Sequence, residues 1–141
     1  MIEDVLDLME MSEFHQQYDV EDIERLIIPA ILNNRCIVIY DDEQTPIGMF
    51  TYTWLNEEAE EGYLEGTRKL QPVDWETDPE HGKLYVIDFI APFNNGSRIA
   101  RNCRSYLSEN THTDDEGLFV RMAKDGRVGR VGRKNAKPTY H

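Results

Sequence analysis

Apolar residues at the start of the chain recur three and four positions apart, which is the spacing of one helix face. Residues 3–11 therefore predict a short amphipathic helix. A second helix is predicted to begin after Asp19, a favourable N-cap, and to end at Asn33 or Asn34. Pro29 falls inside it and should kink the helix or leave one carbonyl free, because proline has no N–H.

The middle of the chain changes to the two-residue period of strands. Residues 35–40 predict a buried strand, and residues 47–55 predict a second one after a polar hairpin connection. Aromatic side chains line one face of the second strand, so we expect both faces to be covered. A short acidic helix opening at residues 56–61 and an irregular connection at residues 66–82 follow.

The next apolar run, residues 84–90, predicts a buried strand that contains one acid, Asp88. A buried carboxylate must be paired or held uncharged, and functional sites use both arrangements. A structural ion pair is the equal alternative, with Arg104 or Arg121 as its partner. The pattern alone leaves this choice open.

A turn after this strand has the composition of an anion site. Pro92 ends the pairing of the strand because it lacks an N–H, and a helical pattern begins at Arg98. The residues between them supply loop and N-cap chemistry: Asn94, Asn95, Gly96 and Ser97. A helix N-terminus presents unpaired N–H groups and the positive end of the dipole, which favours an anion. An ordinary capped helix start is the alternative.

The rest of the pattern completes an α/β domain. Residues 98–108 predict a helix, and residues 118–131 predict a closing hairpin with an Asp-Gly turn. The order of elements predicts one α/β sandwich over residues 1–132, in which helices flank a mixed, largely antiparallel sheet with a hairpin at each end. Residues 133–141 form a basic tail.

Charge is divided unevenly along the chain. The net charge is −12, but the residues from Arg121 onward carry seven basic side chains and one acid, so the preceding 120 residues carry eight basic and 26 acidic ones. An acidic body argues against nucleic-acid binding, which needs clustered Lys and Arg. The basic end is either a solvated terminus or a contact for an acidic partner. No membrane-spanning run and no secretory signal occur, so a cytoplasmic location is expected.

Histidine and cysteine are the remaining candidates for chemistry. Histidine titrates near neutral pH and suits proton transfer, but the pattern alone favours a merely exposed loop or terminal residue for each of the four histidines: His15, His81, His112 and His141. Cys36 and Cys103 are expected to be buried, reduced thiols. No metal-ligand spacing, phosphate-binding loop or nucleophile-elbow motif occurs, so no metal site is predicted.

Residues 87–96, with the sequence IDFIAPFNNG, resemble the central motif of the toxin-activating lysine acyltransferases, which fatty-acylate internal lysines of pore-forming repeats-in-toxin proteins. Other segments are similar to this family at matching intervals: residues 12–15, 28–31, 52–56, 74–75, 119–121 and 128–131. Two differences stand out. Asn94 follows the phenylalanine of the motif where the family has glycine, and family members continue further at the C-terminus.

The resemblance implies a GNAT-like acyltransferase fold and a donor presented as an acyl thioester on acyl carrier protein or coenzyme A, with no tightly bound cofactor. His15 and Asp88 match the catalytic histidine and aspartate of the family. His15 would take the proton of a substrate lysine or carry the acyl group, while Asp88 would orient the imidazole. Ser12, Pro92 and the turn residues 94–97 would bind the donor, with backbone amides receiving its phosphate or the oxyanion.

The implied partners are acyl carrier protein and an acceptor protein with target lysines, and the resemblance also allows a homodimer. Because the carrier is acidic, it would dock on the basic tail and on the helix face of Arg98, Arg101 and Arg104. Two other functions fit the same fold: a catalytically inactive binding or structural module, for example in a phage particle, and a small-molecule N-acetyltransferase. A gap between His15 and Asp88 of much more than about 7 Å would argue against a catalytic pair.

Overall fold

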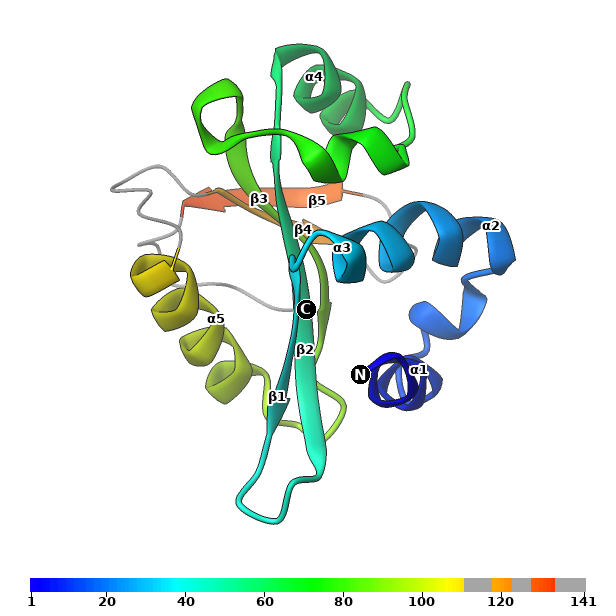
Figure 1. Cartoon of the computed structure of the whole chain (residues 1–141), viewed down its shortest axis with the longest axis vertical. Helices are drawn as coiled ribbons and strands as arrows, with labels where there is room; N and C mark the ends of the chain where they lie inside the picture. The colour runs from blue at the N-terminus through cyan, green and yellow to red at the C-terminus, as the bar shows by residue number, and fades with distance from the viewer. Residues whose placement is uncertain (111–117, 123–127, 134–141) are drawn as a thin grey trace.

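The structure, a computed structural model, describes residues 1–110, 118–122 and 128–133, and it is built around one sheet (Figure 1). Five strands lie in this sheet in the order of the chain: β1 (Cys36–Tyr40), β2 (Pro46–Leu55), β3 (Lys83–Ile90), β4 (Leu118–Met122) and β5 (Val128–Arg133). Neighbouring strands are antiparallel except β3 and β4, which pair in parallel. The predicted mixed, largely antiparallel sheet with a hairpin at each end is thereby confirmed. The predicted Asp-Gly turn and the tail beyond residue 133 lie outside the described residues.

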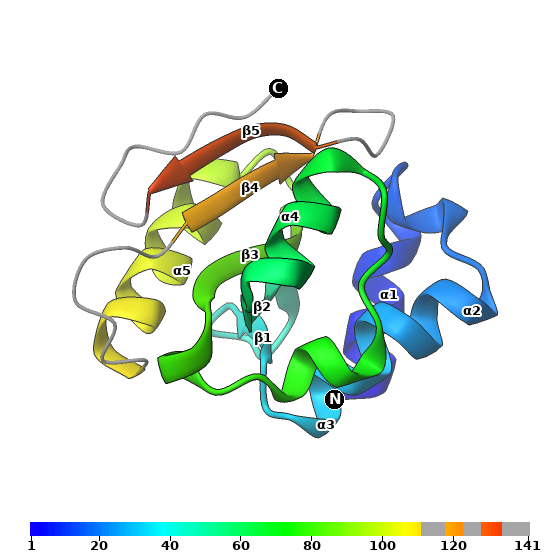
Figure 2. The ribbon, with the colours of Figure 1, turned by 90° about the horizontal axis from the view of Figure 1, so that it is seen from above.

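Helices cover both faces of the sheet, as the views in Figures 1 and 2 agree. The helices are α1 (Ile2–Glu10), α2 (Val20–Asp22), α3 (Ile28–Leu32), α4 (Glu57–Glu65) and α5 (Gly96–Asn110). One apolar core joins α1, α3 and α4 to the sheet, and a second joins α5 to the opposite face. No helix in the described part of the chain is long and apolar enough to cross a bilayer. This three-layer arrangement confirms the predicted α/β sandwich.

Proline changes the course of the second predicted helix without breaking it. Asp19 caps α2 as predicted, accepting the Asp22 N–H at 2.9 Å. A π-helical turn, η2 (Ile23–Ile27), then leads into α3. The wide turn places Pro29 in the first turn of α3, where a helix needs no N–H donor. The expected kink is therefore replaced by a local widening.

Strand β2 separates the two cores, as its alternating pattern predicts. Every residue from Ile47 to Leu55 is buried. Met49 and Leu55 face the core beneath α1 and α3, whereas the aromatic residues of β2 face α5 and pack with its apolar side: Phe50, Tyr52 and Trp54 against Cys103 and Leu107. The second strand is thus covered on both faces, which confirms the expectation from its aromatic content.

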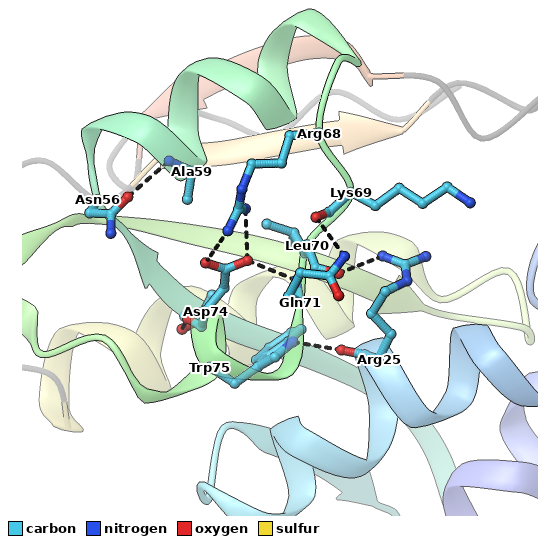
Figure 3. Close-up of polar contacts among 10 residues, drawn as sticks. Arg25, Asn56, Ala59, Arg68, Lys69, Leu70, Gln71, Asp74 and Trp75 are labelled. Atoms are coloured by element: carbon cyan, nitrogen blue, oxygen red, sulfur yellow. Dashed lines mark hydrogen bonds and ion pairs between the residues drawn. The ribbon is translucent and has the colours of Figure 1, made fainter.

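The irregular connection between α4 and β3 is pinned to the second helix by polar contacts (Figure 3). Within its turn η3 (Pro72–Glu76), the buried Asp74 accepts two hydrogen bonds from Arg68, at 2.8 and 3.1 Å. Trp75 Nε1 donates to the Arg25 carbonyl at 3.0 Å, and Arg25 donates to the Leu70 carbonyl at 2.8 Å. A second turn, η4 (Pro79–His81), completes the connection. Asp74 and Trp75 therefore attach this connection to Arg68 and to the second helix.

Candidate functional site

A β-bulge in β3 decides which way Asp88 points. Thr51 pairs with Asp88 while Tyr52 pairs with Val86, so Ile87 is an extra residue on β3. Leu84 and Val86 face α5, and regular alternation would send Asp88 to the same side. Because of the bulge, Ile87 and Asp88 both leave the strand on the face covered by α1. The bulge thus aims the carboxylate at the segment between α1 and α2.

The carboxylate of Asp88 is buried and bound by three side chains. His15 Nε2 lies 3.0 Å from Oδ1, and Tyr18 donates its hydroxyl to the same oxygen at 2.5 Å. Thr51 donates its hydroxyl to Oδ2 at 3.1 Å and accepts the Asp88 N–H at 3.0 Å. With 2 % of its surface exposed, Asp88 is desolvated, and these contacts stabilise it.

His15 is held in place by the turn that carries it. After α1, the Ser12 hydroxyl accepts the His15 N–H at 3.3 Å at the start of the short 3₁₀ turn η1 (His15–Gln17). Ser12 Oγ also lies 2.7 Å from His15 Nδ1. The imidazole packs against the rings of Phe14 and Tyr18, with centroids 5.0 Å away in each case. His15 is 5 % exposed, so the alternative of an exposed loop histidine is wrong for this residue.

The hydrogen bonds assign the two nitrogens of His15 different tasks. A carboxylate only accepts, so Nε2 carries the proton that faces Asp88. Nδ1 is then the basic nitrogen, and the Ser12 hydroxyl donates to it. Ser12 is half-buried, whereas His15 and Asp88 are buried. The basic nitrogen is therefore approached from the side of Ser12, and the arrangement can move a proton.

Groups around Asp88 that ionise at high pH stay protonated at neutral pH. Burial raises the pKa of Tyr18, and the charge and hydrogen bond of Asp88 add to the effect. Burial raises the pKa of Cys36 to about 12 and also raises the pKa of Tyr63, with the charge of Asp88 contributing to both. Cys36 and Cys103 are free and buried, as predicted, and burial raises the pKa of Cys103 as well. These thiols are unsuited to act as nucleophiles.

The turn after β3 differs in detail from the prediction. Helix α5 begins at Gly96, two residues before the expected start, because the Asn95 carbonyl already accepts the Ile99 N–H at 3.1 Å. Asn95, one of the four residues expected to supply loop and N-cap chemistry, therefore holds the capping position. Its side chain accepts the Phe93 N–H at 3.3 Å and donates to the Ile47 carbonyl at 3.0 Å, which ties the turn to β2.

Asn94 takes over the conformation that glycine usually provides. Its φ of 57° lies in the left-handed region, where asparagine is the best tolerated residue after glycine. Asn94 can therefore adopt this conformation without a glycine at the position. Helix α5 begins directly after this turn, at Gly96, and anion binding at its N-terminus stays a prediction.

The predicted site residues fall into two groups. Ser12, His15 and Asp88 form one chain of hydrogen bonds, although His15 and Asp88 are 73 positions apart. Pro92 and the turn residues Asn94, Asn95, Gly96 and Ser97 lie beyond the end of β3, and at about 3.3 Å per residue Pro92 is at most about 13 Å of chain from Asp88. Tyr18 and Thr51 are additional contacts that the sequence analysis missed. For Tyr18 the available signal was its position three residues after His15.

Comparison with known proteins places the chain in a family. The family model of the RTX toxin acyltransferases (HlyC) matches residues 1–134. The chain belongs to this family. The resemblance inferred from residues 87–96 is thereby confirmed.

Relatives of the family with curated names share about three residues in ten with this chain. The RTX-II toxin-activating lysine-acyltransferase ApxIIC of Actinobacillus pleuropneumoniae is 30% identical over 138 residues, which cover 92% of this chain and 81% of the relative. The protein-lysine myristoyltransferase RtxC of Kingella kingae is 28% identical over 114 residues, covering 81% of this chain and 62% of the relative. The uncharacterized protein sll0720 of Synechocystis is 28% identical over 125 residues, covering 88% and 80%.

Proposed function

We propose that this protein is a protein-lysine acyltransferase, which moves an acyl group from a thioester of acyl carrier protein or coenzyme A to the side-chain amine of a lysine in a target protein. One observation carries the proposal: in a chain of the acyltransferase family, His15 Nε2 and Asp88 Oδ1 lie 3.0 Å apart in a buried site. The names of two relatives, a toxin-activating lysine-acyltransferase and a protein-lysine myristoyltransferase, support lysine as acceptor.

The proposed chemistry starts with removal of a proton from the acceptor. A lysine side chain has an ordinary pKa of about 10.4 and is protonated at neutral pH, so it cannot attack a thioester until it loses a proton. Nδ1 of His15 takes this proton, with the hydroxyl of Ser12 as relay. The negative charge of Asp88 stabilises the imidazolium that forms.

The lysine nitrogen then forms a bond to the thioester carbonyl carbon, and the carbonyl oxygen takes up the negative charge. The attacking nitrogen is now positively charged and releases its second proton to solvent. When the tetrahedral intermediate collapses, the carbon–sulfur bond breaks and the thiolate leaves. The imidazolium of His15 returns its proton to the thiolate, which restores the base and releases a free thiol. The products are an amide on the lysine and the thiol of the carrier or coenzyme.

The donor is proposed to enter between β3 and β4. These strands pair at two positions among the described residues, Tyr85 with Leu118 and Val86 with Phe119, whereas β3 goes on pairing with β2 as far as Ile90. A parallel pair that parts beyond Val86 is what a GNAT-like fold would use to admit the pantetheine arm. The amides at the start of α5 would then bind the phosphate of the donor.

Docking of an acidic carrier protein is proposed on the basic residues of α5 and of the C-terminal tail. Arg98 and Arg101 are exposed on α5 near the turn, and Arg104 is half-buried one turn further on. With the basic residues 133–141, these side chains would attract the carrier by charge. The proposal keeps the cytoplasmic location and the possible homodimer expected from the sequence.

Transfer of a labelled acyl chain tests the proposal. The purified chain is incubated with labelled acyl carrier protein or acyl coenzyme A and a lysine-containing target protein, and label on lysine is located by mass spectrometry. We expect transfer by the wild-type chain and loss of at least about 10²-fold in His15→Ala, because general-base catalysis contributes that much. His81→Ala, which changes an exposed histidine, is the matched control.

Three results would overturn the proposal. Transfer that is equal in His15→Ala and the wild type would remove the proposed base. Donor binding without transfer to any protein lysine would favour the inactive binding module. Label found on a free small amine, and on no protein, would identify a small-molecule N-acyltransferase.

A further inference from the structure

Tyr18 makes two contacts with the pair of His15 and Asp88 at once. Its hydroxyl lies 2.5 Å from Oδ1 of Asp88, the oxygen that also faces His15 Nε2. Its ring packs on the imidazole of His15, with the ring centroids 5.0 Å apart. It therefore contacts both members of the proposed catalytic pair.

Local backbone geometry explains how one residue reaches both partners. Positions i and i+3 eclipse each other in a 3₁₀ turn, and His15 and Tyr18 stand in this relation across η1. The Tyr18 N–H donates to the His15 carbonyl at 3.1 Å, which closes the turn. Phe14 packs edge-to-face against both the imidazole of His15 and the ring of Tyr18. The tyrosine is thus held rigidly against the pair.

We propose that Tyr18 is a positioning residue, whose hydroxyl fixes Asp88 Oδ1 and lowers the pH at which His15 becomes a free base. This inference rests on the proposed acyl transfer. A hydroxyl that donates to a carboxylate spreads part of its negative charge, so the carboxylate attracts a neighbouring imidazolium less strongly. Without the hydroxyl, Asp88 would stabilise the protonated imidazole more, and His15 would lose its proton at higher pH.

Other ionisable groups around the pair keep one charge state in the relevant pH range. The charge of Asp88 acts on Cys36 of β1 and on Tyr63 of α4, and the charge of Asp22 of α2 acts on Tyr18. Burial raises the pKa of Cys36 to about 12 and raises that of Tyr63, while the pKa of Asp22 is lowered, by hydrogen bonds that outweigh its desolvation. These three groups therefore do not change their charge between pH 5 and 8.

The first experiment follows the imidazole directly by NMR. Ring C–H resonances of the four histidines are titrated in the full chain, and His15 is assigned by its disappearance in His15→Gln. We expect Tyr18→Phe to move the midpoint of the His15 titration upward by about half to one pH unit, because a hydrogen bond to a charged group is worth about one to two pH units and only part of that effect reaches the imidazole. Tyr40→Phe is the matched control, since Tyr40 donates to the carboxylate of Asp4 on the surface.

A second variant guards against a folding defect in Tyr18→Phe. Replacement of Tyr18 by 3-fluorotyrosine keeps the ring and the hydroxyl but makes the hydroxyl a stronger donor. The midpoint should then move downward, opposite to the shift in Tyr18→Phe. An unchanged midpoint in both Tyr18 variants, or equal shifts in Tyr18→Phe and Tyr40→Phe, would overturn the inference.

The kinetic experiment separates this inference from the proposed function. In Tyr18→Phe, the acidic limb of the kcat/KM profile should move upward with the NMR midpoint, and kcat at pH 7 should fall about 3-fold to 10-fold with KM unchanged. If the wild type transfers no acyl group, the proposed function fails, yet the NMR titration still decides the role of Tyr18. If the wild type transfers and Tyr18→Phe has an unchanged profile, the inference about Tyr18 fails alone.

Discussion

Replacing Asp88 by asparagine should abolish most catalysis while leaving the fold intact. Asparagine has the same shape, so its oxygen can still accept from His15 and Tyr18. Its amide group would face Thr51 Oγ1, which already accepts the N–H of residue 88 and has a second lone pair. The substitution therefore removes the negative charge, while the amide donates to Thr51 Oγ1 in place of the hydrogen bond that the Thr51 hydroxyl donates to Asp88 Oδ2.

The size of the effect follows from the geometry. Two unit charges at the 3.0 Å separation of His15 Nε2 and Asp88 Oδ1 interact with about 5.5 kcal/mol at an effective dielectric constant of about 20. The dipole of the amide replaces part of this stabilisation of the imidazolium. We expect a loss of about 3–5 kcal/mol in the transition state, which is about 10²-fold to 10⁴-fold in kcat.

Steady-state acyl transfer and thermal unfolding together check this prediction. Asp88→Asn should show the drop in kcat with KM little changed and a Tm within about 5 °C of the wild type. Asp4→Asn, which removes an acid from the surface helix α1, should behave like the wild type in both assays. If Asp88→Asn folds and keeps more than a tenth of the wild-type kcat, the charge of Asp88 does not stabilise the reacting imidazole.

Three further predictions concern stability. Arg68→Met should lower the free energy of unfolding, measured by urea denaturation, by about 2–3 kcal/mol, because it leaves the buried Asp74 without its ion-pair partner; partial exposure of Arg68 keeps the loss at this size. The double variant Arg68→Met with Asp74→Asn should recover most of this loss. A double variant as unstable as Arg68→Met would contradict this account. Asn94→Gly should unfold at or above the wild-type Tm, whereas Asn94→Val should lower the free energy of unfolding by about 1–2 kcal/mol. Equal stabilities of the two variants would show that the positive φ carries no strain. Stability should fall as pH rises above about 9, by up to about 1.4 kcal/mol per pH unit for each thiol, because burial keeps Cys36 and Cys103 protonated in the folded chain only; a slope unchanged in Cys36→Ala would refute this.

Periodicity and capping rules were sufficient for the layers of the fold. The strand of residues 47–55 was expected to be covered on both faces because its aromatic residues alternate, and it is buried throughout. Asp19 was recognised as a cap from its residue type alone. These features depend on neighbours within one element, which is the range over which a sequence pattern acts.

The site depended on contacts that no local pattern contains. His15 and Asp88 are 73 positions apart, and only the resemblance to a family selected this histidine from four. The extra residue in β3 has no composition of its own, because Ile87 looks like any other apolar strand residue. Asp74 was named only as part of the family resemblance, and its pairing with Arg68 was not predicted, since a carboxylate in a connection with two prolines gives no sign of being buried.

The bulge in β3 also determines which single-residue deletions in this strand would keep Asp88 on the side of His15. Even-numbered residues up to Val86 face α5, whereas Asp88 and Ile90, also even-numbered, face the opposite side. Loss of Ile87 in a relative would restore one parity along the strand and still leave the carboxylate on the side of His15. Loss of Val86 or any earlier strand residue would shift the pairing of everything before it. In diverged chains of this family, a one-residue deletion at Ile87 is therefore compatible with a carboxylate that still points toward the histidine. Sequence alignments around the motif should allow a gap at this position.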